Sequence, residues 1–570
     1  MKRKTRQFGD KRPRKQAIID TALEPRFPPP GKTAAEDTAA VMKFYKLPFS
    51  FPREVVGEAE SLRLRDEDVL KSVKCAGRDS GAPTRLDLRK KFIFTCDPQS
   101  ARDYDDALSL ETDRKGNRIL GVHIADVSHY VRPGSAIDRE AYKRSTSVYL
   151  CDKVVPMLPE VLCNGLCSLV PNEDRFAFSV FMTFDKKGEM IGRSFAKSVI
   201  RSKARYTYEQ VMEIIGREKR SRSREEKRSR GQKRSREEKV IREISKLAQQ
   251  LRAIRFANGA LDIEIPEAEP ILDENKELAG LVTRPYDESH QMIEECMVSA
   301  NEAVAKELWT NGVKILARLH EPPEEEKIQM LREELRGLGV KVGNIENPKV
   351  FAQFLQTIKS NPLYPTLSVM VLRSMKKAVY DSTAIGHFGL AKRYYAHFTS
   401  PIRRYPDLTL HRQLAAYLGN GELGTGNGES GTGNRGRGNT AKARVAPRLL
   451  AAWAEHTSER EQLAAEAERG LLEIKKFRLL EDQLNTRQIV DYDAVITKCM
   501  PFGAFVEIPE LAVSGLVHVS LLSRRFVKYN EYDHSLSAPG GGSWRIGDRL
   551  RVHVARVDFR ERRIDFVPVR

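Results

Sequence analysis

The sequence predicts an α+β protein of more than one domain, in which a large mixed α/β domain is followed by a small all-β barrel. Its 570 residues, 40% of them hydrophobic, are enough for two to four domains with sizeable cores. Short strands, turns and amphipathic helices follow one another from about residue 91 to residue 480. From about residue 488 the pattern consists of strands alone, which indicates a second unit of a different class.

The charge balance favours a polyanionic partner. The formal net charge is +19, which favours nucleic acid before an anionic membrane. No apolar run reaches the roughly 18 residues of a membrane-spanning helix, and the chain begins Met-Lys-Arg-Lys without an apolar signal core. The seven cysteines are odd in number and scattered, which predicts reduced thiols. We therefore expect a cytoplasmic protein without a membrane segment.

The first 90 residues predict a tail and a short helical segment. Residues 1–40 mix Lys and Arg with Pro28 to Gly31, which indicates a flexible basic leader or a solvated tail without a function. Residues 41–90 are more apolar, and Glu54 to Leu64 has the spacing of a helix. We expect this helical lead-in to pack on the next domain.

Four aspartates lie within ten residues at the start of the large domain: Asp97, Asp103, Asp105 and Asp106. Two carboxylates about 4 Å apart repel by about 4 kcal/mol at an effective dielectric constant of roughly 20, so the cluster needs protons, cations or solvent. On a regular strand Asp106 would face away from its two neighbours, so convergence requires an irregular loop. Such a loop could hold Mg²⁺, the usual metal of phosphodiester hydrolysis.

Two other interpretations of this stretch are open on spacing alone. It could be a solvated acidic turn, or it could be a calcium loop. A calcium loop of the EF-hand type needs Gly at its sixth position and Glu at its twelfth, and no register of this stretch supplies them.

The pattern Asp97-x5-Asp103-x-Asp105-Asp106 closely resembles the active-site signature of the RNB exoribonucleases, the ribonuclease II and ribonuclease R family. The resemblance implies a mixed α/β RNB catalytic domain over residues 91–480. It also implies that Asp97, Asp103 and Asp106 position Mg²⁺, while Asp105 holds the catalytic metal and its attacking water. Long members of the family carry two cold-shock domains at the N-terminus, and the lead-in is too short to hold them.

Tyr149 lies in a short strand pattern, where an aromatic residue is ordinarily a half-buried strand residue. It resembles the aromatic residue that stacks on the 3′-terminal base in the RNB family. Stacking of a base on an aromatic ring contributes roughly 1–3 kcal/mol without requiring a particular sequence. The resemblance therefore implies that Tyr149 binds the end of the RNA.

The pair Glu294 and Glu295 lies on a helix that begins near His290. A glutamate pair on a helix is ordinarily solvated, but the family places a glutamate of this segment near the RNA 3′ end, and Glu295 is our choice for that catalytic position. Gly259 to Glu264 has the pattern of a strand. Within it, Ile263 stands where the family often has a phenylalanine against the terminal base, so this contact would lack an aromatic face.

Arg403 and Arg404 follow Ser400-Pro401, an extended entry to a helix that begins near Tyr405. Adjacent arginines are ordinarily surface charge. The segment from His397 to Arg412 resembles a second family motif, which makes Arg403 the expected contact to the scissile phosphate and Arg404 an RNA-binding neighbour. A guanidinium suits this role because it binds two phosphate oxygens and stays charged at any working pH.

Two insertions are expected within the catalytic domain. Residues 217–239 hold 12 Lys and Arg against 5 Glu and have no apolar stripe, so they form either a solvated helical excursion or a phosphate-binding arm. Residues 419–440 are Gly-rich and repetitive, which indicates a flexible loop. No Lys-Ser/Thr follows this loop at the spacing of a phosphate-binding motif.

The last unit, residues 488–570, contains five short strand patterns in about 80 residues. This number suits a small OB-fold barrel, and the segment resembles the S1 RNA-binding domain. Phe502, Phe505 and His518 are the side chains that we expect on its RNA-binding face, against the alternative of ordinary barrel packing.

The expected function is that of a monomeric, Mg²⁺-dependent 3′→5′ exoribonuclease. It would hydrolyse single-stranded RNA to 5′-mononucleotides by a two-metal mechanism. The alternative is an RNA-binding protein on the same scaffold that cleaves weakly or not at all. The absence of cold-shock domains from the lead-in, the aliphatic Ile263 and the two insertions motivate that alternative.

Overall fold

A computed structural model gives the fold of most of the chain. It describes residues 27–73, 85–221, 236–263, 268–283, 286–345, 347–361, 363–419, 440–487, 489–531 and 534–569. Most of the basic leader, the centre of the insertion at 217–239, nearly all of the insertion at 419–440, and Cys75 and Glu264 lie outside these residues.

A seven-stranded sheet, in the order β1-β8-β7-β4-β3-β2-β9, forms the centre of the large domain. Its strands are β1 (Leu86–Asp87), β2 (Phe94–Cys96), β3 (Asp106–Thr112), β4 (Arg118–Ala125), β7 (Asp174–Phe184), β8 (Met190–Arg201) and β9 (Ala204–Tyr206). The inner strands pair antiparallel, whereas β1 with β8 and β2 with β9 pair parallel.

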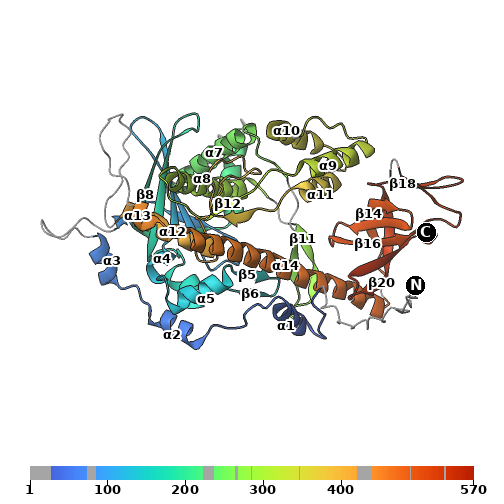
Figure 1. The fold of residues 1–570 in the computed structure, drawn as a ribbon, viewed down its shortest axis with the longest axis horizontal. Helices are drawn as coiled ribbons and strands as arrows, with labels where there is room; N and C mark the ends of the chain where they lie inside the picture. The colour runs from blue at the N-terminus through green and yellow to red at the C-terminus, as the bar shows by residue number, and fades with distance from the viewer. Residues whose placement is uncertain are drawn as a thin grey trace, which may run out of the picture.

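Helices cover both faces of this sheet (Figure 1). One face packs against α6 (Tyr208–Ser221), α7 (Arg236–Ala257), α8 (Glu288–Thr310) and α12 (Tyr405–Leu418). The other packs against α2 (Arg53–Ser61), α3 (Asp66–Val73), α4 (Val127–Tyr130), α5 (Ala136–Arg144) and the π-helix η1 (Val161–Leu166). The helices predicted near His290 and Tyr405 are confirmed as α8 and α12.

Three helices form a cap with its own core: α9 (Glu325–Gly337), α10 (Pro348–Ile358) and α11 (Tyr364–Ser374). The strand predicted from Gly259 onward is wrong for its described part, because residues 259–263 pair with no strand among the described residues. Leu261 and Ile263 instead pack on the cap, and the Leu261 N–H donates to the Gly389 carbonyl oxygen at 2.9 Å. The apolar alternation thus serves burial against helices.

Two-stranded sheets and short helices lie around these layers. They are α1 (Ala34–Phe44), β5 (Val148–Leu150), β6 (Lys153–Val155), β10 (Ala268–Leu272), β11 (Leu278–Thr283), β12 (Ala317–Leu319), β13 (Val379–Asp381) and α13 (Thr440–Ala443). No helix in the described residues is long and apolar enough to cross a membrane. None of the six cysteines in these residues takes part in a disulfide.

The 39-residue helix α14 (Pro447–Asn485) runs from the large domain to the barrel (Figure 1). Along its length it contacts α1, β5, β11, β13 and the barrel strand β20. Phe477 and Leu480 near its end belong to the core of the barrel. The helix is therefore shared by both folded units.

The barrel is closed in the strand order β14-β15-β16-β21-β20. Its strands are β14 (Tyr492–Met500), β15 (Gly503–Ile508), β16 (Val513–His518), β20 (Arg549–Asp558) and β21 (Arg563–Pro568), with α15 (Val519–Leu522) and a side sheet of β17 (Lys528–Asn530), β18 (Ser535–Ala538) and β19 (Gly542–Trp544). A Cβ at Gly515 would lie 2.4 Å from the Phe566 ring, so closure requires glycine there. The predicted fold class, a mixed α/β domain followed by an OB-type barrel, is confirmed.

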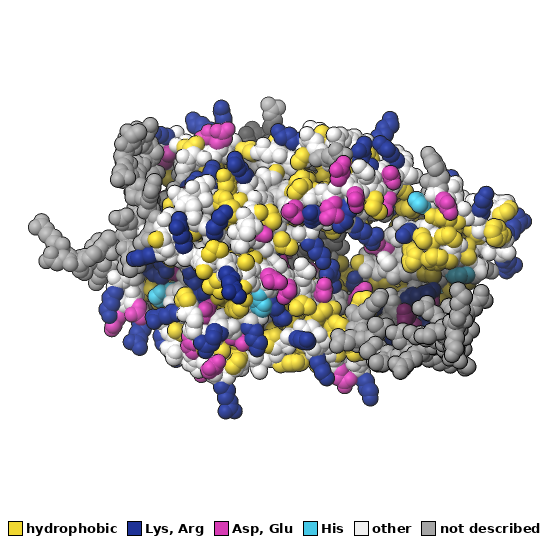
Figure 2. Space-filling model, in the orientation of Figure 1, with side chains coloured by type: hydrophobic (Ala, Val, Ile, Leu, Met, Phe, Trp, Pro, Cys, Tyr) yellow, Lys and Arg dark blue, Asp and Glu magenta, His cyan; other side chains and the backbone are white. Residues whose placement is uncertain are grey.

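Lys and Arg side chains are spread over the face of the molecule shown in Figure 2, and hydrophobic side chains gather over its barrel end. Phe502 and Phe526 are among the exposed large hydrophobic residues of the barrel. A basic body with exposed aromatic side chains fits the expectation of an RNA partner.

Candidate active site

The loop that joins β2 to β3 carries the aspartate cluster, and other elements hold its shape. Arg205 on β9 donates from Nη2 to the carbonyl oxygens of Pro98 and Gln99, at 2.8 and 2.9 Å. The Ser168 hydroxyl accepts the Tyr104 N–H at 3.0 Å. These contacts replace the ladder hydrogen bonds of a regular hairpin, so the loop can depart from strand alternation.

Asp105 is the most enclosed of the four carboxylates, with 5% of the residue exposed. Its Oδ1 accepts the Ile402 N–H at 3.0 Å, and its Oδ2 lies 3.7 Å from Nε of Arg403. Burial raises the pKa of Asp105, while the Arg403 charge and the Ile402 hydrogen bond oppose the rise. The two sequence motifs, about 300 residues apart, therefore meet at this carboxylate.

Asp97 and Asp106 bear carboxylates in an environment that disfavours their charge. Burial, followed by the charge of Asp106, raises the pKa of Asp97 to about 8. Burial likewise raises the pKa of Asp106 to about 6, against the opposing charges of Arg403 and Arg404. Oδ2 of Asp97 is buried and has no hydrogen-bond partner among the described residues. A cation beside these carboxylates would stabilise their charged forms and would give Oδ2 of Asp97 a partner.

The cluster fits a divalent cation by its donor chemistry. No group of three or more Asp, Glu, His or Cys side chains in the described residues is already arranged to hold a metal ion. Mg²⁺, however, keeps several waters and binds through one or two carboxylates. The mutually repelling carboxylates and the orphaned Oδ2 of Asp97 suit such a site.

Arg403 is free to meet a substrate. Its side chain is 43% exposed, and Nη2 donates to the Ser400 hydroxyl at 3.0 Å. The main chain beside it is fixed, because the Arg403 carbonyl oxygen accepts the Ser147 N–H at 3.0 Å. The guanidinium therefore lies beside Asp105 with part of its hydrogen-bonding capacity available.

Arg404 points inward and is occupied. Its Nε and Nη2 donate to the two carboxylate oxygens of Asp407 at 3.0 and 2.9 Å, and Asp407 is fully buried. Arg404 was expected to bind RNA. In the structure its guanidinium already binds the Asp407 carboxylate through two hydrogen bonds. Its charge also opposes the rise that burial causes in the pKa of Asp106.

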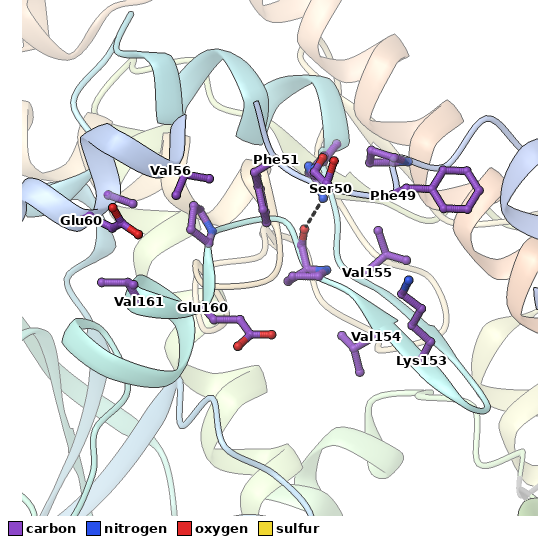
Figure 3. Close-up of a pocket in the computed structure, with 15 residues that line it drawn as sticks. Phe49, Ser50, Phe51, Val56, Glu60, Lys153, Val154, Val155, Glu160 and Val161 are labelled. Atoms are coloured by element: carbon purple, nitrogen blue, oxygen red, sulfur yellow. Dashed lines mark hydrogen bonds between the residues drawn. The ribbon is translucent and has the colours of Figure 1, made fainter. Parts of the chain in front are cut away.

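Tyr149 projects from the hairpin β5–β6 toward the aspartate loop. The residue is 42% exposed, and its hydroxyl donates to Oδ2 of Asp103 at 3.3 Å. Burial and the Asp103 charge raise the pKa of the hydroxyl. Strand β6 also lines a cavity of about 430 Å³, and Lys153 and Val154 are among its lining residues (Figure 3).

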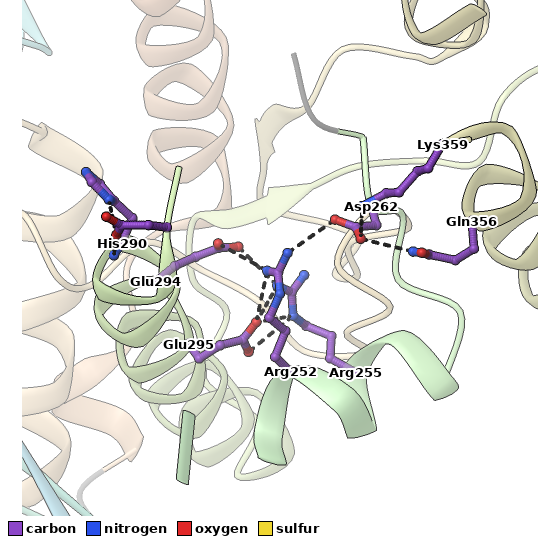
Figure 4. Close-up of polar contacts among 9 residues, drawn as sticks. Arg252, Arg255, Asp262, His290, Glu294, Glu295, Gln356 and Lys359 are labelled. Carbon is purple, nitrogen blue, oxygen red and sulfur yellow. Dashed lines mark hydrogen bonds and ion pairs between the residues drawn. The ribbon is translucent and has the colours of Figure 1, made fainter. Parts of the chain in front are cut away.

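The glutamate pair of α8 is bound by arginines of α7 (Figure 4). Glu295 is 2% exposed and accepts from Arg255 Nε at 3.0 Å and Nη2 at 2.5 Å. Glu294 is 33% exposed and accepts from Arg255 Nη2 at 3.0 Å. Because adjacent helical residues point in different directions, the more exposed carboxylate belongs to Glu294, whereas our sequence-based choice was Glu295. Arg255 itself was not singled out, since one arginine on a charged helix carries no signal.

Asp262 joins this cluster to the cap (Figure 4). It accepts from Arg252 at 3.2 Å, Gln356 at 3.0 Å and Lys359 at 2.6 Å. The neighbouring Ile263 is half-buried against the cap core. The aliphatic residue therefore has a packing role in this chain.

The expected RNA-binding residues of the barrel lie on β15 and β16 or next to them. Phe502 is 45% exposed, and its ring meets the Phe505 ring edge-on with centroids 6.1 Å apart. His518 is exposed and lies opposite Gly503 in the ladder. Phe526, 83% exposed, was missed, although its basic neighbours at 524, 525 and 528 were a usable signal.

Comparison with known proteins decides the family. Residues 85–420 match the RNB domain, and residues 491–567 match the S1 RNA binding domain. The chain belongs to the RNB exoribonuclease family. Ribonuclease R of Thermotoga maritima is 40% identical over 528 residues, which are 92% of this chain and 68% of that protein. The chain spans about two thirds of the length of the curated relatives it matches.

Solved structures agree with this RNB assignment. RNase R of Mycoplasma genitalium, in complex with ribose-methylated single-stranded RNA, matches with a TM-score of 0.79 and 27% identity, over 94% of this chain and 78% of that one. A yeast pseudonuclease, Ssd1, shares the fold at a TM-score of 0.64 and 19% identity, over 88% and 58% of the two chains. The RNB fold therefore does not by itself imply catalysis, which depends on the side chains of the site.

The structure brings together the expected catalytic residues of the two motifs. Tyr149 contacts Asp103, and Arg403 contacts Asp105. The two pairs, Asp97 and Asp106 interact electrostatically. Glu295 belongs to the neighbouring arginine cluster. RNB membership implies a nuclease that depends on a divalent metal, and the aspartate cluster is where the donor set fits one.

Proposed function

We propose that this RNB-family chain removes nucleotides one at a time from the 3′ end of single-stranded RNA and releases 5′-monophosphates, with two Mg²⁺ ions at the aspartate cluster. The observation that carries the proposal is the meeting of Asp105 with Arg403, at 3.7 Å, beside the Tyr149–Asp103 contact at 3.3 Å. Metal-binding carboxylates, a phosphate-binding guanidinium and a base-stacking ring lie together there.

Each side chain has a distinct proposed role. Asp97, Asp103 and Asp106 would hold Mg²⁺, and Asp105 would hold the catalytic ion; bound Mg²⁺ would supply an activated water and neutralise the leaving oxygen. Arg403 donates to the phosphate oxygens and stabilises the negative charge that grows during attack. Tyr149 stacks on the terminal base and so sets which phosphate lies beside Arg403.

Other parts of the chain would supply the grip on RNA. The barrel, with Phe502, Phe505 and His518, would bind the strand away from the reacting end. The matches at 85–420 and 491–567 support a division into a catalytic domain over about 91–480 and an RNA-binding barrel over about 488–570. We also propose that the chain acts as a monomer in the cytoplasm.

The rival function is RNA binding without cleavage. The yeast pseudonuclease shows that the fold itself is compatible with it. Against it, all four aspartates and Arg403 are present in this chain, and Arg403 lies beside Asp105, which a scaffold that only binds does not require.

A labelled-RNA assay separates the two functions. Single-stranded RNA with a 5′ label is incubated with the chain in Mg²⁺ and, in parallel, in EDTA. The proposal expects a Mg²⁺-dependent ladder that ends in short oligonucleotides. Retarded migration of RNA that stays full-length in Mg²⁺ would establish the binder and refute the enzyme. A preparation carrying Asp105→Asn is the matched control for contaminating nucleases.

A further inference from the structure

The hairpin that carries Tyr149 has little support of its own. Strands β5 and β6 have three residues each and pair with each other in a two-stranded sheet. A two-stranded hairpin is at best marginally stable in water. Strand β6 moreover lines the open cavity of Figure 3. Contacts with other elements must therefore set where Tyr149 points.

Apolar packing supplies part of that support. One face of the hairpin packs on α14 and α1 through Val148, Leu150 and Val155. Apolar contacts are not directional, so they hold the hairpin against the helices without setting its position along them. The Tyr149 N–H donates to Oε1 of Glu468 on α14 at 2.7 Å, which fixes one point of the strand.

The turn of the hairpin is tied to two helices through Asp152. The Thr38 hydroxyl of α1 donates to Oδ2 of Asp152 at 2.6 Å. The Lys475 ammonium of α14 lies 3.7 Å from the same oxygen. The side chains of Asp152 and Lys475 are 2% and 0% exposed. A fully enclosed ion pair therefore sits at the turn, three residues beyond Tyr149.

Lys475 also reaches a second hairpin. Its Nζ donates to the Lys276 carbonyl oxygen at 2.5 Å. Lys276 lies in the turn between β10 and β11, in the left-handed region at φ 64°. One buried ammonium thus binds the turns of two hairpins on the same side of α14.

Stability does not account for this arrangement. Taking two charges out of water is costly, and apolar replacements of a buried ion pair are often neutral or stabilising. Oδ1 of Asp152 is in addition buried with no hydrogen-bond partner among the described residues. Unlike apolar side chains, a buried ion pair fixes the direction and the distance between the two segments that it joins.

We propose that Lys475 and Asp152 are positioning residues for Tyr149: the pair fixes the hairpin turn on α14 and so holds the Tyr149 ring at the mouth of the aspartate loop. The inference rests on the proposed stacking of Tyr149 on the 3′-terminal base. Helix α14 continues into the barrel core through Phe477 and Leu480. The pair therefore lies where the helix of the RNA-binding barrel meets the base-binding hairpin.

The test uses the full chain and an RNA whose 3′-terminal base is 2-aminopurine, with EDTA present to prevent cleavage. Stacking on an aromatic ring quenches the fluorescence of this base. The double variant Lys475→Met/Asp152→Asn removes both charges and keeps an oxygen for Thr38. We expect its thermal unfolding midpoint to be unchanged or raised, its quenching to be largely lost, and its affinity for the RNA to fall about five- to ten-fold.

Two comparisons make the result specific. Lys476→Met changes the neighbouring lysine of α14, whose Nζ donates to Ala512 of the barrel, and should leave quenching as in the wild type. In a Tyr149→Ala background the double variant should cause no further loss of affinity, because residues that act through one another are non-additive. Thr38→Val deletes one contact of Asp152 and should reduce the quenching partly. This variant replaces the double variant in the test if the double variant does not fold.

The outcomes distinguish this inference from the function on which it rests. Unchanged quenching in the folded double variant, or in Thr38→Val if the double variant does not fold, would overturn the positioning role. An equal loss of affinity in the Tyr149→Ala background would do the same. If Tyr149→Ala alone leaves quenching intact, the proposed stacking by Tyr149 fails instead.

Discussion

The aspartate loop and the barrel face would meet the same RNA with opposite physical means. At the loop, Asp105 is 5% exposed and bound to Ile402 and Arg403. At the barrel, Phe502 is 45% exposed and Phe526 83% exposed. The loop is enclosed and holds carboxylates whose charge is disfavoured, whereas the barrel face is open and presents exposed aromatic rings.

This difference predicts how substitutions in the two regions affect turnover and RNA binding. A buried carboxylate acts through its charge in a low-dielectric setting, so its loss has a large effect on a single step. Exposed rings act by stacking, in which each base contributes separately and without regard to sequence. Changes at the loop should therefore abolish turnover, and changes at the barrel should weaken binding in graded fashion.

The largest expected effect is that of Asp105→Asn. The amide keeps the volume and an oxygen for the Ile402 N–H but removes the charge that would hold the catalytic ion. We expect turnover to fall by roughly 4 kcal/mol of transition-state stabilisation, about a thousand-fold, with RNA affinity nearly unchanged. Single-turnover hydrolysis and filter binding on one preparation measure both, and retained hydrolysis would contradict the assignment.

The next effect concerns Arg403. Arg403→Met removes the guanidinium beside Asp105 and should lower kcat about a hundred-fold, as for loss of a donor to a developing negative charge. Arg403→Lys keeps the charge without the planar guanidinium, so its kcat should lie between those of the wild type and Arg403→Met. Steady-state kinetics on a short oligonucleotide separate kcat from KM. A change confined to KM would make Arg403 a binding residue and would weaken the contrast with the barrel.

A smaller effect is expected at the barrel. Phe502→Ala should cost about 1 kcal/mol of RNA binding, roughly five-fold in Kd, because one stacking platform is lost. The kcat value should stay the same, since no contact links this ring to the aspartate loop in the described residues. Equilibrium binding of long and very short RNAs tests this, and an equal loss for an RNA too short to reach the barrel would contradict it.

The smallest expected effect is on the stability of the metal-free protein. The folded chain keeps protons on Asp97 up to a pKa of about 8, whereas the unfolded chain releases them near its ordinary value of about 4. The folded state thus binds more protons between these limits, and stability falls as pH rises through that window. Asp97→Asn does not titrate. The unfolding midpoint of wild type minus that of Asp97→Asn, in EDTA, should fall by a few degrees between about pH 5 and 8; a difference independent of pH would argue against the raised pKa.

Much of the fold was predictable because its signals are local. The helix α8, the start of α12 at Tyr405 and the five strands of the barrel are confirmed. The extended entry expected at Ser400-Pro401 is wrong beyond Ser400, because residues 401–403 form a turn in which the Arg404 N–H donates to the Ser400 carbonyl oxygen at 3.0 Å. The strand expected from Gly259 was wrong because alternating apolar residues can bury themselves against helices as readily as in a sheet. Whether such a segment pairs in a sheet or packs on helices depends on the elements that surround it, and the periodicity of the sequence does not show which elements these are.

The candidate site was predictable as a set of residues and much less as an arrangement. Spacing and family resemblance identified the aspartates, Tyr149 and Arg403, whose catalytic and binding roles stay predictions. They did not reveal that Arg404 is enclosed by Asp407, that Glu294 rather than Glu295 is exposed, or that Phe526 stands out from the barrel. These outcomes depend on side-chain direction within the packed domain.

The amino-acid sequence by itself determined the class of both domains, the carboxylates that would bind metal and the basic balance that suits RNA, because these follow from residue type and local spacing. Only the packing of distant segments places Asp105 beside Arg403 and the buried Lys475–Asp152 pair at the turn of the Tyr149 hairpin. The physical reason is range. A charge is present wherever its residue stands in the chain, but its partner and its burial are chosen when distant segments pack together.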